Sequence, residues 1–125
     1  MPLTYEQARR QAEASIDAFN RQDPDAIVDM LHETVAHRGP FVADHLGGEH
    51  GRAQGKEAMR EFLRWLWATE PHLRHVLEEV FVGLEGFAFL THSEHDGTRY
   101  VFVNQVDDDG LVRDMHVYHG LPPAR

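Results

Sequence analysis

The chain has 125 residues, of which 42% are hydrophobic and 26% charged, as expected for one globular domain with a real core. Its formal net charge of −9 argues against a nucleic-acid or anionic-membrane surface as partner. The absence of cysteine excludes a disulfide, a thiolate metal site and a cysteine nucleophile. No apolar run is long enough for a membrane span or a signal peptide, so we expect a single cytoplasmic domain over residues 1–125.

The first part of the chain predicts two helices. Thr4 begins a capping-box pattern, T-Y-E-Q, and apolar residues recur after it at spacings of three and four, so a helix is expected to run to about Gln22. Asp23-Pro24 follows the pattern of an N-cap and a proline at the first helical position. The second helix is expected to be short and to end near Leu31.

A strand, a loop and a third helix are expected next. Glu33–Arg38 has the composition of a short strand ended by glycine and proline, whereas Phe41–Gln54 contains several glycines and predicts a loop. Lys56–Thr69 is strongly amphipathic and predicts a helix that stops before Pro71. His72–Val82 is then expected to be a long strand.

Three further strands are expected to form an antiparallel meander. They are Phe87–His95, Arg99–Asp107 and Leu111–His119, joined by turns at residues 96–97 and 108–110 that each end in Asp-Gly. Alternation of side chains places the larger apolar groups on one face together with polar groups, and such a wall is typical of a small-molecule pocket. The side chains expected to line this pocket under the third helix are Phe89, Tyr100, Phe102, Asn104, Met115 and His119.

The complete pattern is helix, helix, strand, helix and four strands, which predicts an α+β fold with three helices on one face of a curved antiparallel sheet. This order resembles the nuclear transport factor 2-like superfamily, in particular its SnoaL-like and ketosteroid-isomerase-like branch. The motifs that carry the resemblance are D-P-D-A-I-V-D-M at 23–30, T-V-A-H at 34–37, G-K-E-A-M at 55–59 and D-G-L-V-R at 109–113.

The resemblance implies a cone-shaped shell with a pocket between the helices and the concave sheet, often in a dimer formed through the sheet. It implies no single reaction, because the superfamily contains isomerases, cyclases, dehydratases, epoxide hydrolases and non-enzymes. His37 falls where ketosteroid isomerases place a general-base aspartate, and Ser15 and Phe102 fall near their two oxyanion-hole donors. Since phenylalanine donates no hydrogen bond, that machinery is not expected here. The run 91–97 resembles a segment of SnoaL-like cyclases that brings a histidine, here His95, into the pocket.

His37 and His95 are therefore the expected acid–base pair, because imidazole exchanges protons near neutral pH. Asp44 is a candidate to orient a histidine or to act itself. The histidines have a plainer interpretation as well, in which His37 ends a strand and His95 lies in water at a hairpin. The residues expected to contact a ligand are Ser15, Phe41, Trp65, Phe89, Tyr100, Phe102, Asn104, Met115 and His119.

Ten histidines raise the question of a metal site. Three H-x-x-H pairs, at 72/75, 92/95 and 116/119, lie in expected strands, where residues i and i+3 point to opposite faces and do not chelate together. We therefore expect no metal and no other cofactor. A cross-strand set of His37, His95 and His119 is the alternative that stays open.

These features predict a small cofactor-independent acid–base enzyme of the isomerase, polyketide-cyclase or lyase (dehydratase or hydratase) type. Its substrate is expected to be a mostly apolar small molecule with a carbonyl or hydroxyl group. The alternative is a non-catalytic ligand-binding or dimerisation module of the same fold. A homodimer is expected because no predicted helix covers the outer sheet face. That face carries Val101, Val103, Gln105, Val112, Asp114, His116 and Tyr118.

Overall fold

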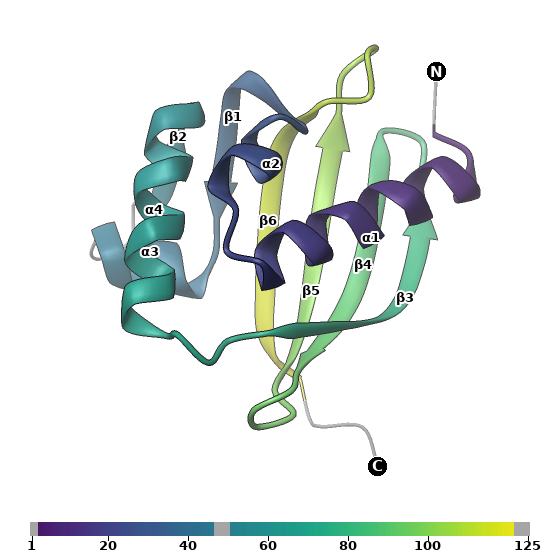
Figure 1. The fold of residues 1–125 in the computed structure, drawn as a ribbon. Helices are drawn as coiled ribbons and strands as arrows, with labels where there is room; N and C mark the ends of the chain where they lie inside the picture. Colours follow the sequence, from purple (N-terminus) through teal and green to yellow (C-terminus); the bar gives the residue numbers. More distant parts are fainter. Residues whose placement is uncertain (1–2, 47–50, 122–125) are drawn as a thin grey trace.

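Four helices and a six-stranded sheet make up the computed structural model, which describes residues 3–46 and 51–121 (Figure 1). This architecture confirms the α+β fold that the sequence predicts. In chain order the elements are α1 (Tyr5–Asn20), α2 (Pro24–Val28), β1 (Leu31–Arg38), α3 (Pro40–Leu46), β2 (Arg52–Gln54), α4 (Lys56–Thr69), β3 (His75–Val82), β4 (Gly86–Ser93), β5 (Arg99–Val106) and β6 (Val112–Leu121).

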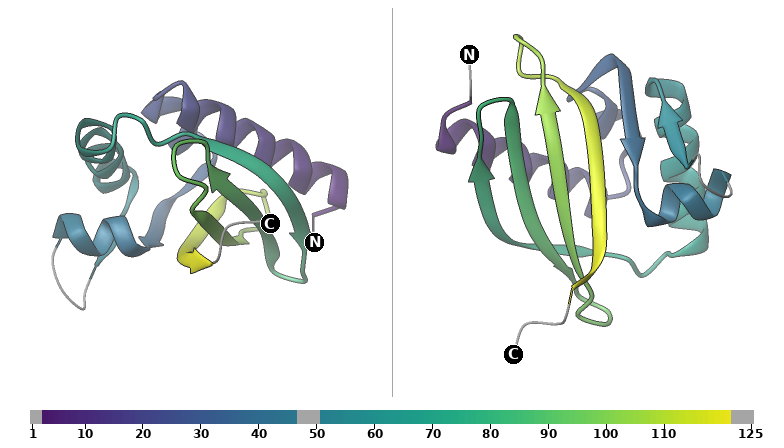
Figure 2. Two further views of the ribbon diagram at one scale, coloured as in Figure 1. Left: turned by 90° about the horizontal axis from the view of Figure 1, so that it is seen from below. Right: turned by 180° about the vertical axis from the view of Figure 1, so that it is seen from behind.

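The six strands lie in the order β2-β1-β6-β5-β4-β3. Strands β3 to β6 pair antiparallel, as the predicted meander requires, and β2 pairs antiparallel with β1. β1 and β6 run parallel, so the sheet is mixed, whereas the sequence led us to expect an antiparallel one. A parallel pair needs a long crossover, and the whole segment from α3 to β5 provides it here. The sheet curves, with α1 lying across its concave face (Figure 2).

The helix ends follow local geometry and strand pairing. Thr4 Oγ1 accepts a hydrogen bond from the Gln7 amide at 3.1 Å, and Gln7 Oε1 accepts one from the Thr4 amide at 2.9 Å, which completes the predicted capping box. α1 ends at Asn20 rather than near Gln22, because Gln22 adopts a positive φ of 56°. α2 is shorter than expected because Leu31 already pairs with β6.

The expectation of a loop over Phe41–Gln54 is wrong for most of that segment. Pro40–Leu46 forms α3, with proline at the first helical position, where its missing N–H costs little. Arg52–Gln54 forms β2, which pairs with β1 so that Ala53 lies opposite His37. Residues 47–50 of the expected loop lie outside the described residues. Both elements are short and contact α4, so tertiary packing rather than local sequence determines them.

The core lies between the helices and the concave face of the sheet. α1 contributes small side chains, including Ala8 and Ala12, which let it approach β3 closely. α4 packs beside β1 and β2 and buries Met59, Phe62, Leu63, Leu66 and Trp67. In the described part of the chain, no helix combines the length and apolar character that crossing a membrane requires.

Candidate functional site

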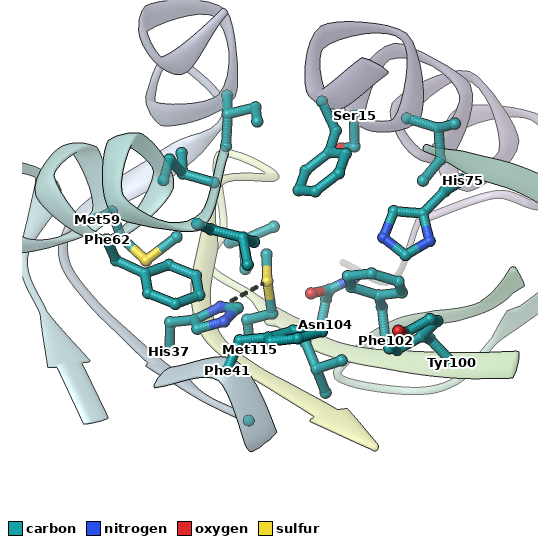
Figure 3. A pocket seen from close by; sticks show the side chains of 18 of the residues that line it. Ser15, His37, Phe41, Met59, Phe62, His75, Tyr100, Phe102, Asn104 and Met115 are labelled. Atoms are coloured by element: carbon teal, nitrogen blue, oxygen red, sulfur yellow. Dashed lines mark hydrogen bonds between the residues drawn. The ribbon is translucent and has the colours of Figure 1, made fainter. Parts of the chain in front are cut away.

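A cavity opens between α1, α4 and the concave face of the sheet (Figure 3). Its volume is about 80 Å³, whereas a single water molecule needs roughly 10–15 Å³. Most of its lining is aliphatic or aromatic, and none of the described residues that line it is Asp, Glu, Lys or Arg. The polar lining residues are Ser15, His37, His75, Tyr100 and Asn104. The cavity therefore suits an uncharged, mostly apolar molecule.

His37 lies on β1, where its ring enters the cavity as the sequence predicts. The residue is only 6% exposed, and its ring packs against Phe62 with the centroids 5.3 Å apart. Its Nδ1 lies 3.0 Å from the sulfur of Met115. Burial, with a smaller contribution from His116, lowers the pKa of His37 to about 4. The imidazole is therefore neutral at physiological pH.

His75 is a second buried histidine in the cavity, and it is not among the site residues expected from the sequence. It begins β3, is 4% exposed, and its Nδ1 lies 2.9 Å from the hydroxyl oxygen of Thr91. Burial, with a smaller contribution from His92, lowers the pKa of His75 to about 4. His75 lies opposite the buried Ser93 of β4, so the pairing of the two strands places it on the inner face of the sheet. A bulge at Glu78 hides this parity in the sequence of β3.

β5 adds two polar groups, Asn104 between the two histidines and Tyr100 beside His75 (Figure 3). Asn104 is 3% exposed, and its Oδ1 has no hydrogen-bond partner among the described residues. Burying a polar atom without a hydrogen-bond partner costs free energy. A ligand or water that donates a hydrogen bond to this oxygen would therefore be favoured. Burial is the main cause that raises the pKa of Tyr100 to about 12, so its phenol remains protonated.

The other expected contacts that line the cavity are largely apolar. Phe41 reaches it from α3, and the rings of Phe89 and Phe102 stack with their centroids 4.6 Å apart. Met115 lies beside His37 (Figure 3). Ser15 also lines the cavity, but its hydroxyl donates to the Gln11 carbonyl at 2.9 Å. These positions agree with the side-chain alternation predicted for the meander.

Four expected site residues do not line the cavity: His95, Asp44, Trp65 and His119. β4 ends at Ser93, so His95 falls in the hairpin, where it is exposed and stacks on His72 with the centroids 6.0 Å apart. The expected pairing of His37 with His95 is therefore not formed. Asp44 is exposed on α3, Trp65 packs against His45 at 4.7 Å between centroids, and His119 is exposed near the end of β6.

The inward face of β6 also differs from the prediction at its start. A bulge at Arg113 lets Val112 pair with Val106, and Val112 rather than Arg113 is buried against the cavity. The three residues of the alternative metal set are not brought together either, since of His37, His95 and His119 only His37 lines the cavity. Among the described residues, no three His, Asp or Glu side chains are grouped to hold a metal ion.

Comparisons with known proteins place this geometry in a family. The sequence model of the SnoaL-like domain matches residues 12–119, which is most of the chain. A SnoaL-like protein of unknown function from Burkholderia thailandensis superposes with a TM-score of 0.86 at 22% identity, covering 96% of this chain and 100% of that chain. No curated protein matches the sequence significantly.

Two further solved structures share the fold. A protein of unknown function with a cystatin-like fold from Methylobium petroleophilum superposes with a TM-score of 0.75 at 15% identity, covering 100% of this chain and 83% of that chain. TerC, co-crystallised with polyporic acid, superposes with a TM-score of 0.73 at 18% identity, covering 90% of this chain and 91% of that chain. At such low identities the similarity shows a common fold only. An activity has to be inferred from the residues that line the cavity.

Proposed function

This chain belongs to the SnoaL-like domain family, and from that premise we propose that its cavity binds an uncharged, mostly apolar small molecule from which His37 removes a proton. The substrate carries a carbonyl or hydroxyl group, and the reaction is an isomerisation, a cyclisation, or the addition or loss of water. TerC, which shares the fold, was co-crystallised with polyporic acid, and this supports a small-molecule ligand here.

The observation that carries the proposal is a neutral imidazole at the wall of an apolar cavity. His37 is buried, and burial holds its pKa near 4, so the ring is neutral at neutral pH with a lone pair free to take a proton, as a weaker base than free imidazole. Its Nδ1 is occupied by Met115, which leaves Nε2 as the accepting nitrogen. An anion that forms beside the ring would attract the new imidazolium strongly, because little water screens charges in such a cavity.

The lining also supports the choice of substrate. A carboxylate or ammonium group would lose its hydration in this cavity without gaining an oppositely charged partner among the described lining residues. A hydroxyl or carbonyl group costs less to desolvate, and Asn104 and Tyr100 offer it hydrogen-bond partners. Aromatic side chains such as Phe89 and Phe102 would cover the apolar remainder of the molecule.

A probe with one abstractable proton tests this proposal without knowledge of the natural substrate. In 5-nitrobenzisoxazole, removal of the ring C–H proton breaks the N–O bond and releases a coloured phenoxide. We expect the protein to accelerate this reaction, with a rate that rises as pH increases through about 4 and is then constant. His37→Gln should lower the rate by roughly 10²-fold. His72→Gln, at an exposed position outside the cavity, should leave it unchanged.

The competing function is ligand binding without catalysis. It is favoured by the position of His95, which lies outside the cavity and leaves His37 without its expected acid partner. A folded His37→Gln variant that retains the full rate, or a wild-type protein that binds the probe without accelerating its ring opening, would reject the catalytic proposal. The second result would support a binding module.

We also propose that two copies pair through the outer face of the sheet. In the described part of the chain no helix lies over this face (Figure 2). Val103 is 40% and Tyr118 is 52% exposed there, and Tyr118 stacks on His116 with the ring centroids 4.4 Å apart. A two-fold axis through this surface would cover the same side chains on both copies.

A further inference from the structure

The hydrogen-bond partner of His37 determines which of its nitrogens carries the proton. Nδ1 lies 3.0 Å from the sulfur of Met115, and a thioether has lone pairs but no hydrogen to donate. The contact is attractive only if Nδ1 carries the hydrogen. The neutral ring then has its lone pair on Nε2, which has no hydrogen-bond partner among the described residues. His37 therefore offers the cavity an acceptor.

His75 has a different hydrogen-bond partner, and its ring carries the hydrogen on the other nitrogen. Its Nδ1 lies 2.9 Å from Oγ1 of Thr91, a side chain with 0% exposure. If Nδ1–H donated to Thr91, the buried hydroxyl hydrogen would have no acceptor within the described residues. If Thr91 donates to Nδ1, both groups are satisfied, and the second arrangement is favoured for that reason. The ring hydrogen then stands on Nε2, and His75 offers the cavity a donor.

We propose that His37 and His75 hold opposite neutral tautomers, and that the cavity thereby selects an uncharged ligand with a polar hydrogen at one end and a carbonyl oxygen at the other. The hydrogen would meet Nε2 of His37, and the oxygen would accept from Nε2–H of His75. The two rings lie on opposite sides of the cavity, with Asn104 and Phe102 between them (Figure 3). The ligand part of this inference rests on the proposed binding function of the same cavity.

The ring of His75 is held in an orientation that preserves this arrangement. It meets Phe19 at 4.8 Å, Tyr100 at 5.0 Å and Phe102 at 5.4 Å between ring centroids, and the last two contacts are edge-on. Rotation of the imidazole would have to displace these rings as well as break the bond to Thr91. Thr91 is therefore a positioning residue, and His75 is the specificity-determining donor.

The tautomers can be read directly by nitrogen NMR of the protein without ligand at pH 7. We expect His37 to show a protonated Nδ1 and His75 a protonated Nε2, with the signals assigned from the single variants His37→Gln and His75→Gln. Thr91→Val, which keeps the shape and removes the hydroxyl, should abolish the preference of His75 and leave His37 unchanged. Met115→Leu should abolish the tautomer preference of His37 and leave that of His75 unchanged. Equal tautomers in the two rings, or a Thr91→Val variant with unaltered His75 signals, would overturn the inference.

Three aromatic probes of similar size test the ligand class. We expect 4-hydroxyacetophenone, which has both groups, to bind more tightly than acetophenone or p-cresol by roughly three- to ten-fold, the value of one added hydrogen bond. Thr91→Val should weaken acetophenone binding and spare p-cresol. Equal affinities for all three would refute the selectivity while the proposed binding function survives. Failure of every probe to bind would refute the ligand part together with that function, whatever tautomers the NMR spectra show.

Discussion

The side chain of Asn20 holds the backbone of His75 by two hydrogen bonds. Its Nδ2 donates to the His75 carbonyl oxygen at 2.8 Å, and its Oδ1 accepts from the His75 N–H at 2.9 Å. Asn20 is the last residue of α1 and His75 the first of β3, so the pair ties the end of the helix to the edge strand of the sheet. Because the imidazole also bonds Thr91, both the backbone and the ring of His75 are fixed in the cavity wall.

Replacement of Asn20 should therefore cost more than replacement of a solvent-facing residue on the same helix. Asn20→Ala leaves two backbone groups of a buried residue without partners, and we expect a loss of about 2–3 kcal/mol in the free energy of unfolding. Asp17→Ala, which removes only an exposed ion pair with Arg21, should cost less than about 1 kcal/mol. Urea unfolding measures the free energy of unfolding of both variants. Equal losses would contradict the role given to Asn20.

Gly86 is required by the close approach of β4 and β5. A Cβ atom at this position would lie 1.9 Å from the carbonyl oxygen of Asn104 and 2.9 Å from the Cα of Gln105. Gly86→Ala must therefore push the strands apart beside a residue of the cavity, and we expect it to destabilise the protein by at least about 1–3 kcal/mol. At Gly83 the nearest atom is 3.9 Å away, so Gly83→Ala should be tolerated. Similar melting temperatures for the two variants would show that the strands adjust freely.

Much of the cavity could be predicted because the meander has regular turns and a regular period. Gly97 and Gly110 adopt positive φ values of 74° and 82°, as their Asp-Gly turns suggest, and the two turns connect β4 to β5 and β5 to β6. Phe89, Phe102 and Asn104 consequently point inward as predicted. The family resemblance located His37 independently of this alternation.

The failures have a common physical origin in pairing that local sequence does not reveal. A bulge at Glu78 concealed His75, and a bulge at Arg113 turned Val112 inward. His95 continues the strand pattern of β4, but the hairpin begins at Ser93, where the Ser93 amide donates to the Thr98 carbonyl at 2.8 Å. The end of a strand depends on its partner strand as much as on its own residues. The roles proposed for the cavity residues stay predictions.

Pairing through the outer sheet face predicts a mass near twice that of the 14.3 kDa chain in light scattering at micromolar concentration. Val103 lies opposite His116 in the β5–β6 pair, and Val103→Glu would place a like charge near its copy across a two-fold axis. This variant should be monomeric and remain folded. Leu84→Glu, in the 89% exposed turn position between β3 and β4, should retain the dimer. A monomeric wild-type protein would refute the pairing.

The two buried histidines predict a loss of stability in mild acid. Their pKa near 4 in the folded state lies below the ordinary value of 6.5. Between these two pH values the histidines are protonated in the unfolded chain and neutral in the folded chain. The free energy of unfolding should fall as pH decreases from about 6.5 to about 4, by about 2 kcal/mol for each histidine at pH 5. Urea unfolding at pH 7 and pH 5 measures this difference. His37→Gln should remove about half of it and the exposed His72→Gln none, and a pH dependence unaltered in His37→Gln would show that His37 is not buried in its neutral form.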